Sequence, residues 1–175
     1  MELELDKGFA GQLLILLESE LINYKYFQLF CDEIIEEHPH PPYWIIDLSV
    51  TRFQPQAVSI VSKFVHSEPF VPLDTDYLCD LYIACLYLRY ERREISWATF
   101  LYSAGSYADS VQAVKEPCEF FYELLNIYEH AEFDAALEQQ QRAAIYDEFK
   151  EEISGITPLY ERFKGCFRRY IQQRA

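Results

Sequence analysis

Residues 75–92 constrain the fold most, because their side chains are apolar nearly all round a helix. Only a narrow polar stripe remains, through Asp76, Asp80 and Glu91. A helix of this kind belongs at the centre of a domain, where other elements cover it. The rest of the chain should therefore supply helices that pack around this one.

Apolar residues recur at i, i+3 and i+4 through most of the remaining chain, which predicts an all-α fold. We expect one helical domain, residues 1–175, of about seven or eight helices. The expected helices are 9–37, which Gly11 or residues 19–23 divide; 43–50; 55–66; 75–92; 97–104; one opened by Pro117; 134–153; and one from 157 onward.

Three local features decide the least regular boundaries. Residues 43–50 are rich in β-branched side chains, as a strand would be, but Pro42 can start a short helix and no partner strand is evident. We favour the helix. Gly105 is placed to end the helix that Ser96 caps. Ser154-Gly155 is placed to end the 134–153 helix before Thr157-Pro158 starts the last one.

The net charge is −14, and it is unevenly distributed along the chain. Residues 1–37 hold nine acids against two lysines, and residues 95–133 hold six acids against Lys115. Residues 155–175 reverse this, with one acid and five bases, which either complement the helix dipole or dock on acidic neighbours. The overall field repels nucleic acid and anionic membranes, and it attracts basic proteins.

Composition indicates a cytoplasmic protein. The N-terminus is acidic where a signal peptide would be basic, and no apolar run reaches the length of a membrane span. The five cysteines are odd in number and contain no C-x-x-C pair, so we expect buried free thiols.

Carboxylates with a neighbouring tyrosine are the best candidates for a partner-binding site. Tyrosine rings supply contact area and carboxylates steer a basic partner. We also expect some of Tyr77, Tyr82, Tyr87 and Tyr90 to reach a surface, since one buried helix cannot easily satisfy four hydroxyls. The candidate site residues are Glu116, Glu119, Tyr122, Glu123, Glu129 and Glu132, with a second set at Glu33, Glu36 and Glu37.

An alternative site is a metal centre at Glu37, His38 and His40. Imidazole and carboxylate are suitable ligands, but the two histidines straddle a proline at a helix end and match no known metal motif. No catalytic motif or cofactor-binding fingerprint is present, so we predict no catalytic residue and no cofactor.

These features favour a protein-binding module that meets a basic partner. The concrete hypothesis is an immunity-type or antitoxin-type inhibitor that covers the positive cleft of a basic toxin such as a nuclease. Two alternatives stay open: a metal- or ligand-binding helical protein or enzyme that uses His38 and His40, and a scaffold or regulatory subunit.

Overall fold

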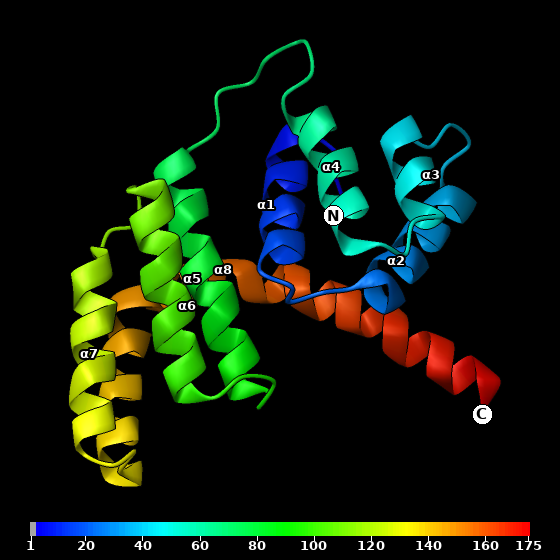
Figure 1. Ribbon diagram of the computed structural model, residues 1–175. Coiled ribbons are helices and arrows are strands. Elements are labelled where there is room, and N and C mark those ends of the chain that lie inside the picture. Colours follow the sequence, from blue (N-terminus) through cyan, green and yellow to red (C-terminus); the bar gives the residue numbers. More distant parts are fainter. Residues whose placement is uncertain (1–2) are drawn as a thin grey trace. The chain divides into compact units, whose positions relative to one another are not determined.

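A computed structural model describes residues 3–175 of the chain. Within this range the protein is all-α, with eight helices and no strand, so the predicted fold class is confirmed (Figure 1). The helices are α1 (Lys7–Glu18), α2 (Tyr24–Glu37), α3 (Tyr43–Ser49), α4 (Gln54–Val65), α5 (Thr75–Glu91), α6 (Trp97–Val111), α7 (Cys118–His130) and α8 (Ala135–Arg174).

The chain forms two compact units. The first contains the described residues up to Leu73 together with Thr157–Ala175, and the second is Asp74–Ile156. The second unit holds seventeen acids against six Lys and Arg residues, whereas the sequence of the first holds twelve against nine. Most of the negative charge therefore belongs to the second unit. The expectation of a single domain stays a prediction.

In the first unit, α1 supplies an apolar core. The Asp6 carboxylate caps the helix by accepting a hydrogen bond of 2.8 Å from the Phe9 amide. Leu13, Leu16 and Leu17 are fully buried. The predicted break at residues 19–23 is confirmed, while Gly11 lies inside the helix.

The next helices of the first unit begin and end at the positions that proline dictates. α2 ends before Pro39, because a residue that precedes proline disfavours helical geometry. α3 follows Pro42, which confirms the preference for a helix over a strand. The rings of Phe30 and Phe163 pack at 4.7 Å and tie α2 to the last part of α8.

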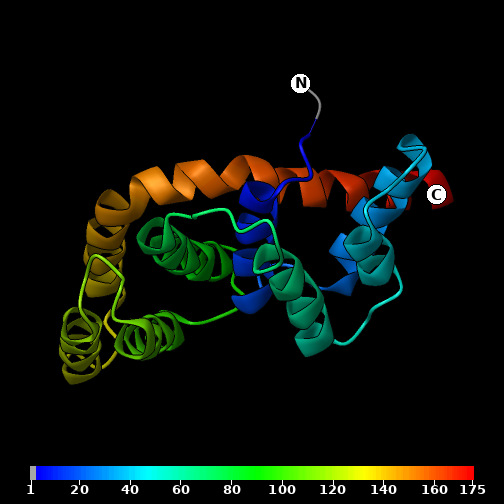
Figure 2. The same cartoon turned by 90° about the horizontal axis from the view of Figure 1, so that it is seen from above.

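In the second unit, α5 lies among the other helices as its sequence predicts. Ile83, Ala84 and Cys85 are fully buried, and even Asp80 of the polar stripe is only 8% exposed. The Asp80 carboxylate accepts a hydrogen bond of 2.8 Å from the Lys115 amide, so the loop between α6 and α7 is fastened to α5. Figure 2 looks nearly down the axes of α6 and α7.

One buried glutamine joins three helices of this unit. Gln141 of α8 accepts a hydrogen bond of 2.8 Å from the Trp97 indole of α6. Its amide nitrogen donates a bond of 2.9 Å to the backbone carbonyl of Leu124 in α7. This side chain fixes how α6, α7 and α8 face one another.

The structure corrects both glycine-based helix ends. α6 continues through Gly105 to Val111. A Cβ at position 105 would lie 2.5 Å from a ring carbon of Tyr122, so a larger residue would not fit at this contact. Glycine is needed there for close packing and not for a turn. α8 likewise continues through Ser154-Gly155 and Pro158. A Cβ at Gly155 would collide with the Tyr77 hydroxyl, so this glycine also makes room for a neighbouring side chain. The predicted break there is wrong.

Candidate protein-binding face

The outward surface of α6 and α7 brings three of the predicted site residues close together. Pro117 precedes α7, and Glu119 stands in its first turn, where the helix dipole favours a carboxylate. Glu123 is one turn further along the same side, and both carboxylates are exposed. Tyr122 lies between them and the neighbouring helix α6, and is half-buried.

Tyr122 meets a second tyrosine that sequence reasoning missed. Its ring centre lies 6.5 Å from that of Tyr102, which projects from α6 and is 61% exposed. Burial, followed by the negative charge of Asp109, raises the pKa of Tyr122. We call Tyr102, Asp109, Glu119, Tyr122 and Glu123 the acidic face.

The charge of the acidic face is not neutralised internally. Between Trp97 and His130 the sequence has one Lys or Arg, Lys115, and its Nζ lies 3.0 Å from both oxygens of Glu152. Among residues 3–175, no Lys or Arg forms an ion pair with Glu119 or Glu123. These carboxylates therefore project an unbalanced negative field.

Three of the other five Lys and Arg residues of the second unit form ion pairs elsewhere. Arg142 forms an ion pair with Glu91 at 3.1 Å. The Glu94 carboxylate forms two ion pairs, with Arg89 at 3.5 Å and with Arg92 at 3.2 Å. None of these ion pairs involves a carboxylate of the acidic face.

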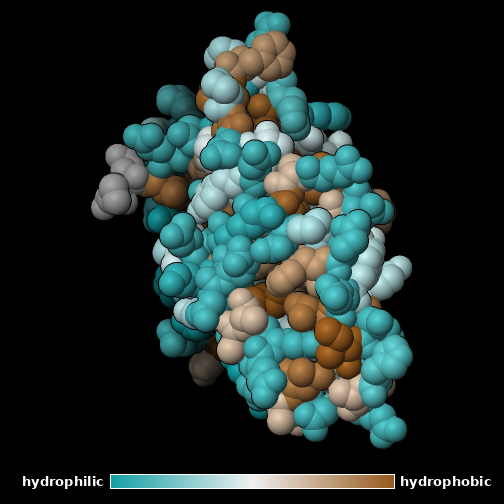
Figure 3. Space-filling view, turned by 90° about the vertical axis from the view of Figure 1, so that its left-hand side faces the viewer, coloured by the Kyte–Doolittle hydropathy of each residue, from teal (hydrophilic) through white to brown (hydrophobic). Residues whose placement is uncertain are grey.

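Apolar side chains lie beside the acidic face, on the side of α7 that turns toward α8. Helical spacing places Phe120, Leu124 and Ile127 in one row, and Ile127 is 47% exposed. On α8, Leu137 and Ala144 stand one turn before and one turn after Gln141, which bonds to the Leu124 carbonyl. We call these five residues the apolar stripe. Figure 3 shows apolar side chains gathered in the lower half of this surface, with hydrophilic ones around them.

Glu116 lies at one end of the apolar stripe, and its carboxyl group is less exposed and less readily ionised than the sequence analysis assumed. Burial, the charge of Glu148 and a hydrogen bond to that carboxyl all raise its pKa. Glu116 is half-buried, so it contributes less to a steering field than an exposed carboxylate would.

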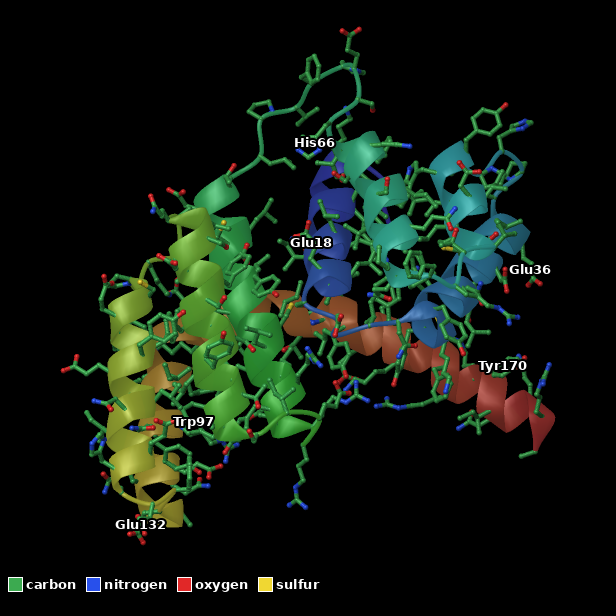
Figure 4. The ribbon with its side chains drawn as sticks, in the orientation of Figure 1. Glu18, Glu36, His66, Trp97, Glu132 and Tyr170 are labelled. Carbon is green, nitrogen blue, oxygen red and sulfur yellow. The ribbon has the colours of Figure 1, made fainter. Side chains whose placement is uncertain are left out.

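The remaining α7 candidates lie toward the other end of the helix. Glu129 is exposed, and Glu132 is exposed in the turn between α7 and α8 (Figure 4). Glu132 and Phe133 have left-handed backbone angles, φ 52° and 60°, which reverse the chain so that α8 can run back along α7. Phe133 is 56% exposed, so an apolar ring stands at this end too.

The second predicted set, on α2, is only partly available. The Arg169 guanidinium holds both oxygens of Glu33, with a shortest contact of 2.7 Å, and the Cys166 thiol donates to the same carboxylate. Burial raises the pKa of Glu33, but these hydrogen bonds outweigh burial and hold it below its ordinary value. The basic last helix therefore docks on an acidic neighbour, one of the alternatives that the sequence left open.

Glu36 and Glu37 lie one turn further on and are exposed (Figure 4). Arg169, which is held by Glu33, also feels the charge of Glu37. These two carboxylates belong to the first unit, whereas the acidic face belongs to the second.

The alternative metal site has no preformed ligand cluster. Within residues 3–175, no group of three or more His, Cys, Asp or Glu side chains converges closely enough to hold a metal ion. His38 is half-buried at the end of α2, and His40 is exposed beyond Pro39.

Three of the four tyrosines of α5 have partners inside the protein. Tyr87 is 1% exposed, and its hydroxyl accepts a hydrogen bond from Arg142. The Tyr90 hydroxyl donates to Glu138 at 2.5 Å, and Tyr82 stacks on Tyr107 with ring centres 3.7 Å apart. The expectation that some of these tyrosines reach a surface is confirmed in part, since Tyr77, Tyr82 and Tyr90 are half-buried. On the acidic face the exposed ring is Tyr102 of α6, where its i, i+4, i+7 spacing with Ser106 and Asp109 was the available signal.

The thiols agree with the sequence-based expectation except at one position. All five cysteines are free; Cys31, Cys79, Cys85 and Cys166 are buried, and Cys118 is partly exposed. Cys118 stands beside the acidic face, with its sulfur 3.3 Å from a carboxylate oxygen of Glu119.

Comparison with known proteins yields no relative: no family model, no curated protein and no solved structure matches the chain. In the described part of the chain, no helix combines the length and the apolar character that crossing a membrane requires.

Proposed function

We propose that the protein is a binding module whose acidic face recognises a basic surface on another protein. One observation carries this proposal: Tyr102 and Tyr122 stand in ring contact among carboxylates, and neither Glu119 nor Glu123 forms an ion pair with a Lys or Arg in residues 3–175. Aromatic rings next to unbalanced charge provide both an anchor and a steering field.

The two kinds of group would act at different stages of binding. Glu119, Glu123 and Asp109 attract a cationic partner over a distance of about one Debye length, ~8 Å at physiological salt, and speed association. Tyr102 and the apolar stripe exclude water once contact is made, which slows dissociation.

In its most concrete form, the module is an immunity-type or antitoxin-type inhibitor of a basic toxin such as a nuclease. The carboxylates of α7 would occupy the cleft that normally holds substrate phosphates. A cytoplasmic location is part of this proposal, and the five free cysteines favour a reducing compartment.

A displayed library of random peptides, panned against the immobilised protein, tests the proposal. We expect enrichment of peptides that combine Lys or Arg with Leu, Phe or Trp. A synthetic copy of the best peptide, labelled with a fluorophore, should associate several-fold more slowly when salt is raised from about 50 to 300 mM.

Two charge-reversed variants locate the binding surface. Glu119→Lys/Glu123→Lys should weaken the peptide about tenfold or more, whereas Glu36→Lys/Glu37→Lys, an equal change of charge on α2, should leave it bound. Loss of binding in the α2 variant alone would move the site to α2. Enrichment of acidic or uncharged peptides, with an association rate that ignores salt, would contradict the proposal and favour the scaffold alternative.

A further inference from the structure

The most exposed group of apolar side chains in the first unit lies at the corner between α3 and α4. Tyr43, Val50 and Phe53 are 87%, 80% and 68% exposed, and Ile46 is 38% exposed. Tyr43, Ile46 and Val50 follow i, i+3, i+7 spacing, so they share one side of α3, and Phe53 comes directly before α4. Contiguous exposed apolar patches mark interaction surfaces.

The corner is also hollowed. A depression of about 530 Å³ lies beside α3, lined on its apolar side by Val50, Phe53 and Ile60. Asp47 and Arg52 stand at the same depression. It can therefore receive an aromatic side chain from a partner while it offers that partner one charge of each sign.

Hydrogen bonds hold the corner in this shape. The Thr51 hydroxyl donates to the backbone carbonyl of Asp47 at 2.8 Å. The amide of Gln28, on α2, donates to the backbone carbonyl of Thr51 at 3.0 Å. A surface fixed before contact loses less conformational entropy on binding.

The two opposite charges at this corner can pair with the same two charges on a second copy of the chain. Asp47 and Arg52 are both exposed, and in the described part of the chain neither forms an ion pair; Arg52 lies over the Tyr24 ring at 5.9 Å. Across a two-fold axis, Asp47 of each copy can meet Arg52 of the other, because such an interface uses the same patch twice.

We infer that two copies of the chain associate through this corner. With a net charge of −14, two copies repel each other over most orientations, but residues 38–73 hold two acids and two bases and are neutral. The four apolar side chains cover on the order of 500 Å² per copy, below the roughly 800 Å² of a standard interface. The dimer is thus a weak one, with a Kd on the order of 10–100 µM.

Sedimentation equilibrium of the full chain over a range of concentrations tests this inference. The average mass should rise from monomer toward dimer as concentration increases to several hundred micromolar, about ten times that Kd. Val50→Glu and Phe53→Ser should each keep the protein monomeric. Phe70→Ser is the matched control, since Phe70 is 72% exposed in the loop after α4 and should leave dimerisation unchanged.

Exchanging the two charges distinguishes specific pairing from general repulsion. Asp47→Arg makes the chain less negative, so if net repulsion alone mattered, this variant would dimerise more strongly. Paired contacts across the axis predict the opposite: Asp47→Arg and Arg52→Asp should each weaken the dimer several-fold, and the double variant should restore it.

A chain that stays monomeric at several hundred micromolar would overturn the inference, as would a dimer that Val50→Glu and Phe53→Ser leave intact. A dimer that loses its apolar contacts in those variants but is strengthened by Asp47→Arg would contradict the paired charges. The inference does not depend on the acidic face, because Glu119→Lys/Glu123→Lys should leave the dimer in place.

Discussion

Glu116 and Glu148 are hydrogen-bonded to each other, carboxyl to carboxyl, where the start of α7 meets α8. Burial and the negative charge of Glu148 both disfavour the ionised form of Glu116, because like charges at short range repel. The pair lies at one end of the apolar stripe.

Replacing Glu116 with glutamine should stabilise the protein at neutral pH. The pKa of Glu116 is raised in the fold, so its contribution to stability is present below the unfolded pKa and is lost as pH rises through the folded pKa. Glu116→Gln removes that loss, so we expect the Tm to rise by about 1–3 °C at pH 7 and to change little at pH 4. Thermal unfolding followed by circular dichroism measures both.

Glu119→Gln is the control on the same helix. Hydrogen bonds from its own backbone amide and from Cys118 lower the pKa of Glu119, so its ionised form is favoured in the fold. This substitution should leave the Tm at pH 7 unchanged or lower it. If both variants shifted the Tm in the same direction, the Glu116–Glu148 contact would not be the cause.

Gln141 should be the most sensitive polar side chain in the second unit. Gln141→Leu leaves the Trp97 indole and the Leu124 carbonyl without partners in a buried place, which costs about 2–4 kcal/mol of unfolding free energy. Urea denaturation measures the difference. Gln140→Leu, one residue earlier and exposed, should change stability by less than about 0.5 kcal/mol.

The bond between Arg169 and Glu33 should be visible as a coupling energy. A double-mutant cycle with Arg169→Met and Glu33→Gln should give about 0.5–1 kcal/mol, a modest value because both side chains are partly exposed. The Glu33 pKa is lowered in the fold, so this stability is present above the unfolded pKa and is lost as pH falls through the folded pKa. Urea denaturation at pH 7 and below pH 3 checks both statements.

A matched cycle with Arg174→Met and Glu37→Gln should show no coupling, since Arg174 lies over the Tyr170 ring and is not paired with Glu37. A coupling of the same size in this second cycle would mean that general electrostatics, and not the paired geometry, explains the first.

The helices were predictable from the sequence because their signals are local. Asp6, Asn23, Ser96 and Asp134 act as N-caps, and the all-round apolar pattern of α5 corresponds to real burial. Each of these depends on residues within one or two turns, so periodicity and capping chemistry suffice to find them.

The continuation of α6 through Gly105 and of α8 through Gly155 could not be predicted, because the role of each glycine depends on distant residues. A glycine inside a helical pattern either ends the helix or makes room for a neighbour, and the local sequence is the same in both cases. The neighbours are Tyr122 for Gly105 and Tyr77 for Gly155. The acidic face could be predicted only in part, again because it depends on distant residues. The carboxylates of α7 follow one another in the sequence and were predicted. Tyr102 and Asp109 join them only because α6 packs on α7, which the local sequence does not show.

Cys118 should be the thiol that reacts in the folded protein. It is partly exposed, whereas the other four are buried, and burial raises the pKa of Cys166 to about 12. Titration with iodoacetamide should therefore modify one thiol under native conditions and five in urea, and Cys118→Ser should abolish the native reaction.

The reaction at Cys118 should be slow, because the hydrogen bond to Glu119 raises its thiol pKa. Glu119→Gln removes that effect and should speed labelling several-fold near pH 8, where the thiolate fraction limits the rate. An unchanged rate in this variant would show that the Glu119 carboxylate does not control the Cys118 thiol, and rapid labelling of a second native thiol would contradict the burial of the other four.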